Sequence, residues 1–170
     1  MKMLYLLVGI VAVLSGGFYA LNNYIYNDKK GDDTETSMQN SSDSPVQVIP
    51  ISHATAVLGW GDAVMYTDPT GGTEAFKGQP SPTLVFVTDI HGDHFDVETL
   101  NAIIGTAALI VPQAVKELLP ENLSSRAKVM KNGETITELG FQITAMPMYN
   151  IPESEKAFHT KGRGNGYVVE

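Results

Sequence analysis

Four side chains that can bind a metal ion lie within six residues of one another near the middle of the chain. They are Asp89, His91, Asp93 and His94. They follow Thr83–Thr88, an apolar β-branched run that predicts a buried strand, and loops at strand ends are where a sheet positions ligands. Because Gly92 lets the chain turn sharply, the four can form two pairs. Two pairs suit two divalent ions about 3.5–4 Å apart that share a water.

Carboxylate and imidazole donors favour Zn, Mn or Fe, so we expect one or two divalent metal ions, Zn or Mn, as the cofactor. The alternative is a solvated polar loop that binds no metal. The sequence contains no cysteine, which excludes disulfides, a thiol nucleophile and cysteine-ligated zinc. A net charge of −8 offers no basic surface for a nucleic acid, so a small-molecule substrate is the expected partner.

The first 45 residues fall into two segments. Residues 1–26 are almost entirely apolar, long enough to cross a bilayer as a hydrophobic helix, and have tyrosines near both ends. They predict a transmembrane anchor or, alternatively, a secretory signal segment, although Phe18 stands where signal cleavage favours a small residue. Both predict a membrane-anchored or exported protein, at the bacterial periplasm or cell surface. Residues 27–45 are polar and predict a disordered linker.

Residues 46–170 carry short apolar runs separated by turn residues. These predict mostly strands, interrupted by a helix that Asp96 caps and that ends near Ile104, and by a helix from Pro112 to Leu119 that Pro120 ends. The predicted strands are Val46–Ile51, Ala54–Gly59, Ala63–Tyr66, Thr83–Thr88, Ala107–Val111, a short one at Val129, Thr135–Glu138, Phe141–Met146 and Tyr167–Val169. Such a pattern predicts an α/β or α+β layered domain.

Several segments resemble one known family. Thr88–His94 (T-D-I-H-G-D-H) resembles the T-H-x-H-x-D-H motif of the metallo-β-lactamase superfamily. Segments 51–58 and 66–69 are similar to its opening strand and its D-P segment. P-M-Y-N at 147–150, F-H-T-K-G at 158–162 and G-N-G-Y-V at 164–168 are similar to a block of its lactonase-like and phospholipase-D-like branch.

The resemblance implies a fold and its extent. That superfamily folds as a four-layer αββα sandwich of two similar halves. Residues 46–170 resemble only the N-terminal half, since the sequence ends at the strand that should lead into the second half. The expectation is therefore half of a sandwich, preceded by the N-terminal hydrophobic helix, with the missing C-terminal half absent or supplied by a separate chain.

The resemblance also implies roles for individual residues. Asp89 stands where the family has the first histidine of its first metal site, and His91 matches the second. Asp93 and His94 match ligands of the second site, and Asp93 would also be catalytic by orienting the attacking hydroxide. The family's third first-site histidine is missing after Phe141–Met146, which leaves His159 as the remaining candidate.

Three polar residues have two interpretations each. His159 either binds metal or substrate, or is an ordinary loop histidine. His53 either lines the metal pocket or packs in a strand. Asp68 either caps a turn or braces the metal loop as a carboxylate behind the ligands.

The function that follows is a metal-dependent hydrolase, in which a metal-activated water attacks an ester, a lactone or a phosphodiester. True β-lactamase activity is not expected, because Asp89 and the Tyr149–Asn150 region depart from that subgroup. The alternative is a truncated, non-catalytic, membrane-tethered half-domain that binds a metal or a partner chain. It follows from the same missing half, which in the family supplies a bridging carboxylate and a final histidine.

Overall fold

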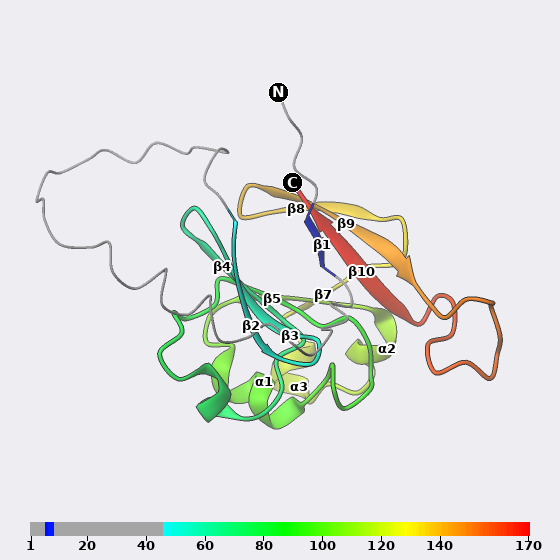
Figure 1. Ribbon diagram of the computed structural model, residues 1–170, viewed down its shortest axis with the longest axis horizontal. Helices are drawn as coiled ribbons and strands as arrows, with labels where there is room; N and C mark the ends of the chain where they lie inside the picture. The colour runs from blue at the N-terminus through cyan, green and yellow to red at the C-terminus, as the bar shows by residue number, and fades with distance from the viewer. Residues whose placement is uncertain (1–5, 9–45) are drawn as a thin grey trace, which may run out of the picture.

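The computed structural model describes residues 6–8 and 46–170 of the chain. Two sheets lie face to face, and short helices cover the outer face of the larger sheet (Figure 1). The described residues thus form three layers, helices, sheet and sheet, and the α/β prediction is confirmed at this level.

The larger sheet has six strands, among them the predicted strands Ala54–Gly59 and Ala63–Tyr66, which pair as a hairpin. Their order is β2 (Gln47–Ser52), β3 (Thr55–Trp60), β4 (Ala63–Thr67), β5 (Leu84–Phe86), β6 (Ala108–Val111) and β7 (Ala127–Val129). Strands β2, β3 and β4 are antiparallel, whereas β4 to β7 run parallel. Because the parallel strands end at one edge, the loops after β4 and β5 meet there.

The smaller sheet is antiparallel throughout. Its order is β1 (Leu6–Val8), β10 (Gly164–Val169), β9 (Phe141–Met148) and β8 (Thr135–Glu138). Strand β9 is two residues longer than predicted and β10 three residues longer, so together they carry the chain past Pro147 and Gly164 to the edge where β5 ends.

Asp96 caps the first helix, as predicted. Its side chain accepts hydrogen bonds from the backbone N–H groups of Glu98 and Thr99 and starts α1 (Val97–Ile103).

The helix predicted for Pro112–Leu119 was wrong in its extent. It ends early, as α2 (Gln113–Lys116), and a short helix that the sequence did not predict, α3 (Glu121–Ser124), begins after Pro120. A proline disfavours helical backbone in the residue before it, so Pro120 separates α2 from α3. One 3₁₀ turn, Thr73–Phe76, precedes β5.

The N-terminal predictions fall almost wholly outside the described residues. Within the segment predicted as a hydrophobic helix, only Leu6–Val8 is described, and it forms β1 beside β10. The anchor or signal segment and the 27–45 linker therefore stay predictions. No helix in the described part of the chain has the length and apolar character needed to cross a membrane.

Strand β5 is buried on both faces, which explains its unbroken apolar sequence. Leu84 and Phe86 face the smaller sheet and pack with Tyr167 of β10, whereas Val85 and Val87 face the helices. Since neither face of β5 meets solvent, the loop that follows it is anchored to the most deeply buried part of the fold.

Gly164 lets β10 approach the end of β5 closely. A Cβ atom at this position would lie 2.5 Å from Met148 Cε and 2.8 Å from the carbonyl oxygen of Thr88. The next residue, Asn165, donates its N–H to that same oxygen at 3.0 Å. The two sheets are thereby joined by a backbone hydrogen bond at the start of the polar loop.

Replacing Gly164 by alanine should lower the free energy of unfolding by about 1–3 kcal/mol, because the added methyl group overlaps backbone as well as a side chain. Urea unfolding measures the change. Gly59→Ala is the matched control, since a Cβ there meets its nearest neighbour, Gln47 Cβ, at an ordinary 3.8 Å. An equal loss in both variants would contradict the role of the close approach.

Candidate metal centre

Asp68 organises the loop that follows β5. It lies just after β4, is buried, and has a left-handed φ of 43°. Its Oδ1 accepts the Thr88 N–H at 2.7 Å, and its Oδ2 accepts the Thr88 hydroxyl at 2.7 Å. The same Oδ2 lies 2.9 Å from His94 Nδ1. One carboxylate therefore fixes both the start of the loop and the ring of His94.

This contact engages Nδ1 of His94, and the other ring nitrogen, Nε2, lies 3.7 Å from Asp93 Oδ2. The hydrogen bond with Asp68 raises the pKa of His94 above its usual value, while burial raises the pKa of Asp68 against the opposing effect of His94 and Thr88. A carboxylate that holds one ring nitrogen and leaves the other free is the arrangement that orients histidine ligands in metal sites.

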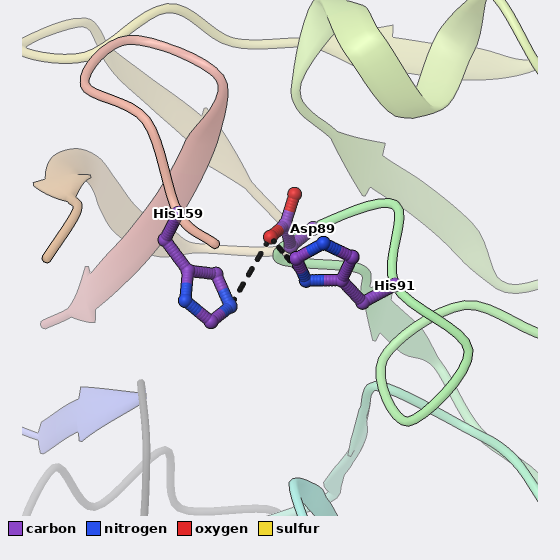
Figure 2. Close-up of side chains that lie close together, drawn as sticks. All are labelled: Asp89, His91 and His159. Carbon is purple, nitrogen blue, oxygen red and sulfur yellow. Dashed lines mark ion pairs between the residues drawn. The ribbon is translucent and has the colours of Figure 1, made fainter. Parts of the chain in front are cut away.

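Asp89 lies at the centre of a second cluster (Figure 2). Its side chain is fully buried, and its Oδ2 lies 3.3 Å from His91 Nδ1 and 3.3 Å from His159 Nε2. A tetrahedral ion with bonds of about 2.0–2.1 Å keeps its ligand atoms about 3.3 Å apart. Within the described part of the chain, these three residues form a candidate metal site, because each offers one ligand atom and these atoms all lie within 4.8 Å of one another.

The surroundings of His159 Nε2 indicate whether a metal fits this cluster. The atom is buried and has no hydrogen-bond partner, although buried polar atoms are nearly always paired. Burial also lowers the pKa of His159, which favours the neutral ring that a metal requires. An unpaired nitrogen next to a carboxylate and a second imidazole therefore fits a divalent cation.

The loop between β9 and β10 (orange to red in Figure 1) holds His159 in place. Asn150 Oδ1 accepts the His159 N–H at 2.8 Å, and the Asn150 N–H donates to the His159 carbonyl at 3.0 Å. The ring then lies 5.0 Å from that of His91 and 5.8 Å from that of His94, centroid to centroid. His159 therefore stands between the two clusters.

The sequence interpretation did not predict that Arg163 pairs with Asp89. Its Nε donates to Asp89 Oδ1 at 2.9 Å and its Nη2 donates to Asp89 Oδ2 at 2.8 Å. Burial alone would raise the pKa of Asp89, but the hydrogen bonds from Arg163 and from the backbone of Ile90 bring it below its usual value. Arg163 lies four residues after His159 in a glycine-rich loop, and nothing in that local pattern points to Asp89.

The structure thus places the predicted residues in three settings. Asp89 and His91 lie together with His159, and His94 is held nearby by Asp68. The Asp93 side chain is 55% exposed and approaches His94. His53 occupies an exposed turn between β2 and β3 with a φ of 46°, not a packed position within a strand.

The turn that carries His53 still borders the site. Thr67 Oγ1 donates to the Ala54 carbonyl at 2.9 Å, and Thr55 Oγ1 donates to the Asp68 carbonyl at 2.5 Å. These two bonds tie the β2–β3 turn to the segment of Asp68. A substrate contact by His53 therefore stays a prediction.

A family model described as the beta-lactamase superfamily domain matches residues 47–170. The chain belongs to the metallo-β-lactamase superfamily. Its fold resembles that of a protein from Parabacteroides distasonis named as a metal-dependent hydrolase, with 25% identity, a TM-score of 0.63 and coverage of 74% of this chain. Igni18, a metallo hydrolase from the archaeon Ignicoccus hospitalis, has 15% identity, a TM-score of 0.53 and 74% coverage.

A third similar fold belongs to CmlA, a diiron β-hydroxylase from Streptomyces venezuelae, with 17% identity, a TM-score of 0.58 and 75% coverage of this chain. The chain spans 56% of the length of the Parabacteroides protein, 55% of that of Igni18 and 28% of that of CmlA. No curated protein matches its sequence.

Replacing Asp68 by asparagine should weaken metal binding by about 10–100-fold, the usual effect of losing a partner behind a ligand. An amide N–H facing His94 Nδ1 would move the ring proton to Nε2 and so remove the free lone pair. We also expect a loss of about 1–3 kcal/mol in the free energy of unfolding. Calorimetric titration with Zn²⁺ and urea unfolding measure the two effects. Asp62→Asn, in an exposed turn, is the control, and unchanged metal affinity in Asp68→Asn would contradict the assigned role.

Proposed function

We propose that this chain forms the metal-binding part of a metal-dependent hydrolase that acts on a small ester, lactone or phosphodiester. The observation that carries the proposal is the meeting of Asp89, His91 and His159, in which the buried His159 Nε2 has no hydrogen-bond partner. Membership of a superfamily with metallo-hydrolase members supports it.

In this proposal Asp89, His91 and His159 hold one divalent ion, and His94 with Asp93 supplies donors for a second. A bound ion would supply Lewis acidity and a water of lowered pKa. Asp68 keeps Nε2 of His94 free by holding Nδ1. Asp93 is exposed enough to meet a substrate or a water, and its carboxylate would orient the water that attacks and accept a proton from it.

The metal should be a hard ion such as manganese rather than zinc, because Asp89 contributes an oxygen donor at the centre of the cluster. Elemental mass spectrometry of the chain, purified at neutral pH after growth with both metals, measures the content. Asp89→His, which exchanges the oxygen donor for an imidazole, should shift the content toward zinc. Stoichiometric zinc in the unaltered chain would contradict the preference.

The reaction is tested with a generic phosphodiester, bis(4-nitrophenyl) phosphate, and a generic ester, 4-nitrophenyl acetate, in the presence of Mn²⁺ or Zn²⁺. Asp93→Asn should reduce the turnover by about 100-fold or more, because general-base groups contribute rate factors of that size. Asp62→Asn should leave the turnover unchanged, since it removes the same charge from an exposed turn.

One further outcome separates the two candidate functions. A chain that binds its metal but hydrolyses neither compound would overturn the hydrolase proposal for this chain. It would support the alternative of a non-catalytic metal- or partner-binding domain. The observation that favours this alternative is the small number of donors at the second position, where the described part of the chain offers Asp93 and His94.

A further inference from the structure

The Asp89 carboxylate already has a cation bound to it from the chain itself. Arg163 reaches both of its oxygens, at 2.9 and 2.8 Å, in the forked geometry that makes arginine–carboxylate pairs strong. The Arg163 side chain is 22% exposed and that of Asp89 is fully buried, so the pair is largely shielded from water.

Three nitrogens from three residues approach one oxygen atom. Around Asp89 Oδ2, Arg163 Nη2 lies at 2.8 Å, while His91 Nδ1 and His159 Nε2 both lie at 3.3 Å. Nη2 also lies 3.4 Å from His91 Nε2. The guanidinium therefore stands at the oxygen that a metal would need, and it brings a positive charge into the same few ångströms.

We propose that Arg163 sets the metal affinity of the Asp89–His91–His159 site by competing with the divalent ion for Asp89. This inference rests on the proposed metal site and adds a residue that determines how tightly the site binds. With the arginine in place, the ion meets two imidazoles and a carboxylate whose charge is already balanced by Arg163.

A structural contact of Arg163 would have the opposite effect on metal affinity. Its Nη2 also donates to the Phe158 carbonyl, next to His159, so the side chain links the loop of His159 to Asp89. A linking residue would strengthen metal binding. However, Asn150 holds both the N–H and the carbonyl of His159 independently of the arginine. The repulsion between the guanidinium and a doubly charged ion in a partly buried site is therefore the larger effect.

The test compares the full chain with Arg163→Gln, titrated by calorimetry with Mn²⁺ and with Zn²⁺. Removing the competing charge should lower the dissociation constant at least tenfold. Lys161→Gln is the matched control, because it removes a cation of the same loop that is 53% exposed and pairs with Glu153 rather than with Asp89. It should leave the dissociation constant unchanged.

Thermal unfolding gives a second measurement. Arg163→Gln leaves the buried Asp89 charge without its partner, so the metal-free variant should melt at a lower temperature than the unaltered chain. Because binding stabilises in proportion to the logarithm of affinity, saturating Zn²⁺ should raise its melting temperature by more than it raises that of the unaltered chain.

A third measurement uses the unaltered chain, so it holds even if Arg163→Gln does not fold. The Arg163 Nε–H, which donates to Asp89, should give a slowly exchanging ¹⁵N–¹H signal without metal. Addition of Zn²⁺ should shift that signal and speed its exchange with water. Arg163→Lys assigns the signal by removing it.

The outcomes are distinguishable. In one outcome the unaltered chain binds metal, Arg163→Gln binds it no more tightly, and the Nε–H signal does not move. This outcome would overturn the competition and leave the proposed metal site standing. Absence of metal binding in the unaltered chain and in Arg163→Gln would overturn both. Binding in the unaltered chain that is lost in His159→Ala and strengthened in Arg163→Gln would support both.

Discussion

The candidate metal centre depends on the close approach of β10 to the backbone at the end of β5. Gly164 has no side chain to prevent this approach, and the hydrogen bond from Asn165 N–H to the Thr88 carbonyl fixes it. The loop before β10 is thereby held against the loop after β5. This contact brings the loop of His159 and Arg163 next to Asp89, where Arg163 then donates to both carboxylate oxygens.

The two buried carboxylates of the site, Asp68 and Asp89, have different roles. Asp68 accepts hydrogen bonds from Thr88 and contacts His94, so its carboxylate holds these two residues in position. Asp89 is held by Arg163 and by the Ile90 N–H, yet one of its oxygens still faces His91 and His159. Burying an ionised carboxylate is unfavourable unless it is paired. Both carboxylates meet that requirement, and Asp89 in addition directs one oxygen at two candidate metal ligands, His91 and His159.

The sequence predicted the parts of this site that are local. The β5 strand, the loop from Asp89 to His94 and the Asp96 cap each depend on residues that are adjacent in the chain, and their patterns are unambiguous. The partnership of Arg163 with Asp89 joins residues 74 positions apart, and no periodicity encodes it. Helix α3 was missed because four residues are too few to show a helical period, and the exposed position of His53 follows from a left-handed turn rather than from strand alternation.

The 74 positions between Asp89 and Arg163 in the sequence have a consequence for biosynthesis. Strands β4 to β7 pair in parallel in chain order, so the larger sheet can assemble as it leaves the ribosome. The cluster around Asp89 needs a later segment as well, since His159 and Arg163 lie in the loop between β9 and β10. Contacts between distant residues form late in folding. The cluster of Asp89, His91 and His159 can therefore be complete only once the loop between β9 and β10 has been synthesised.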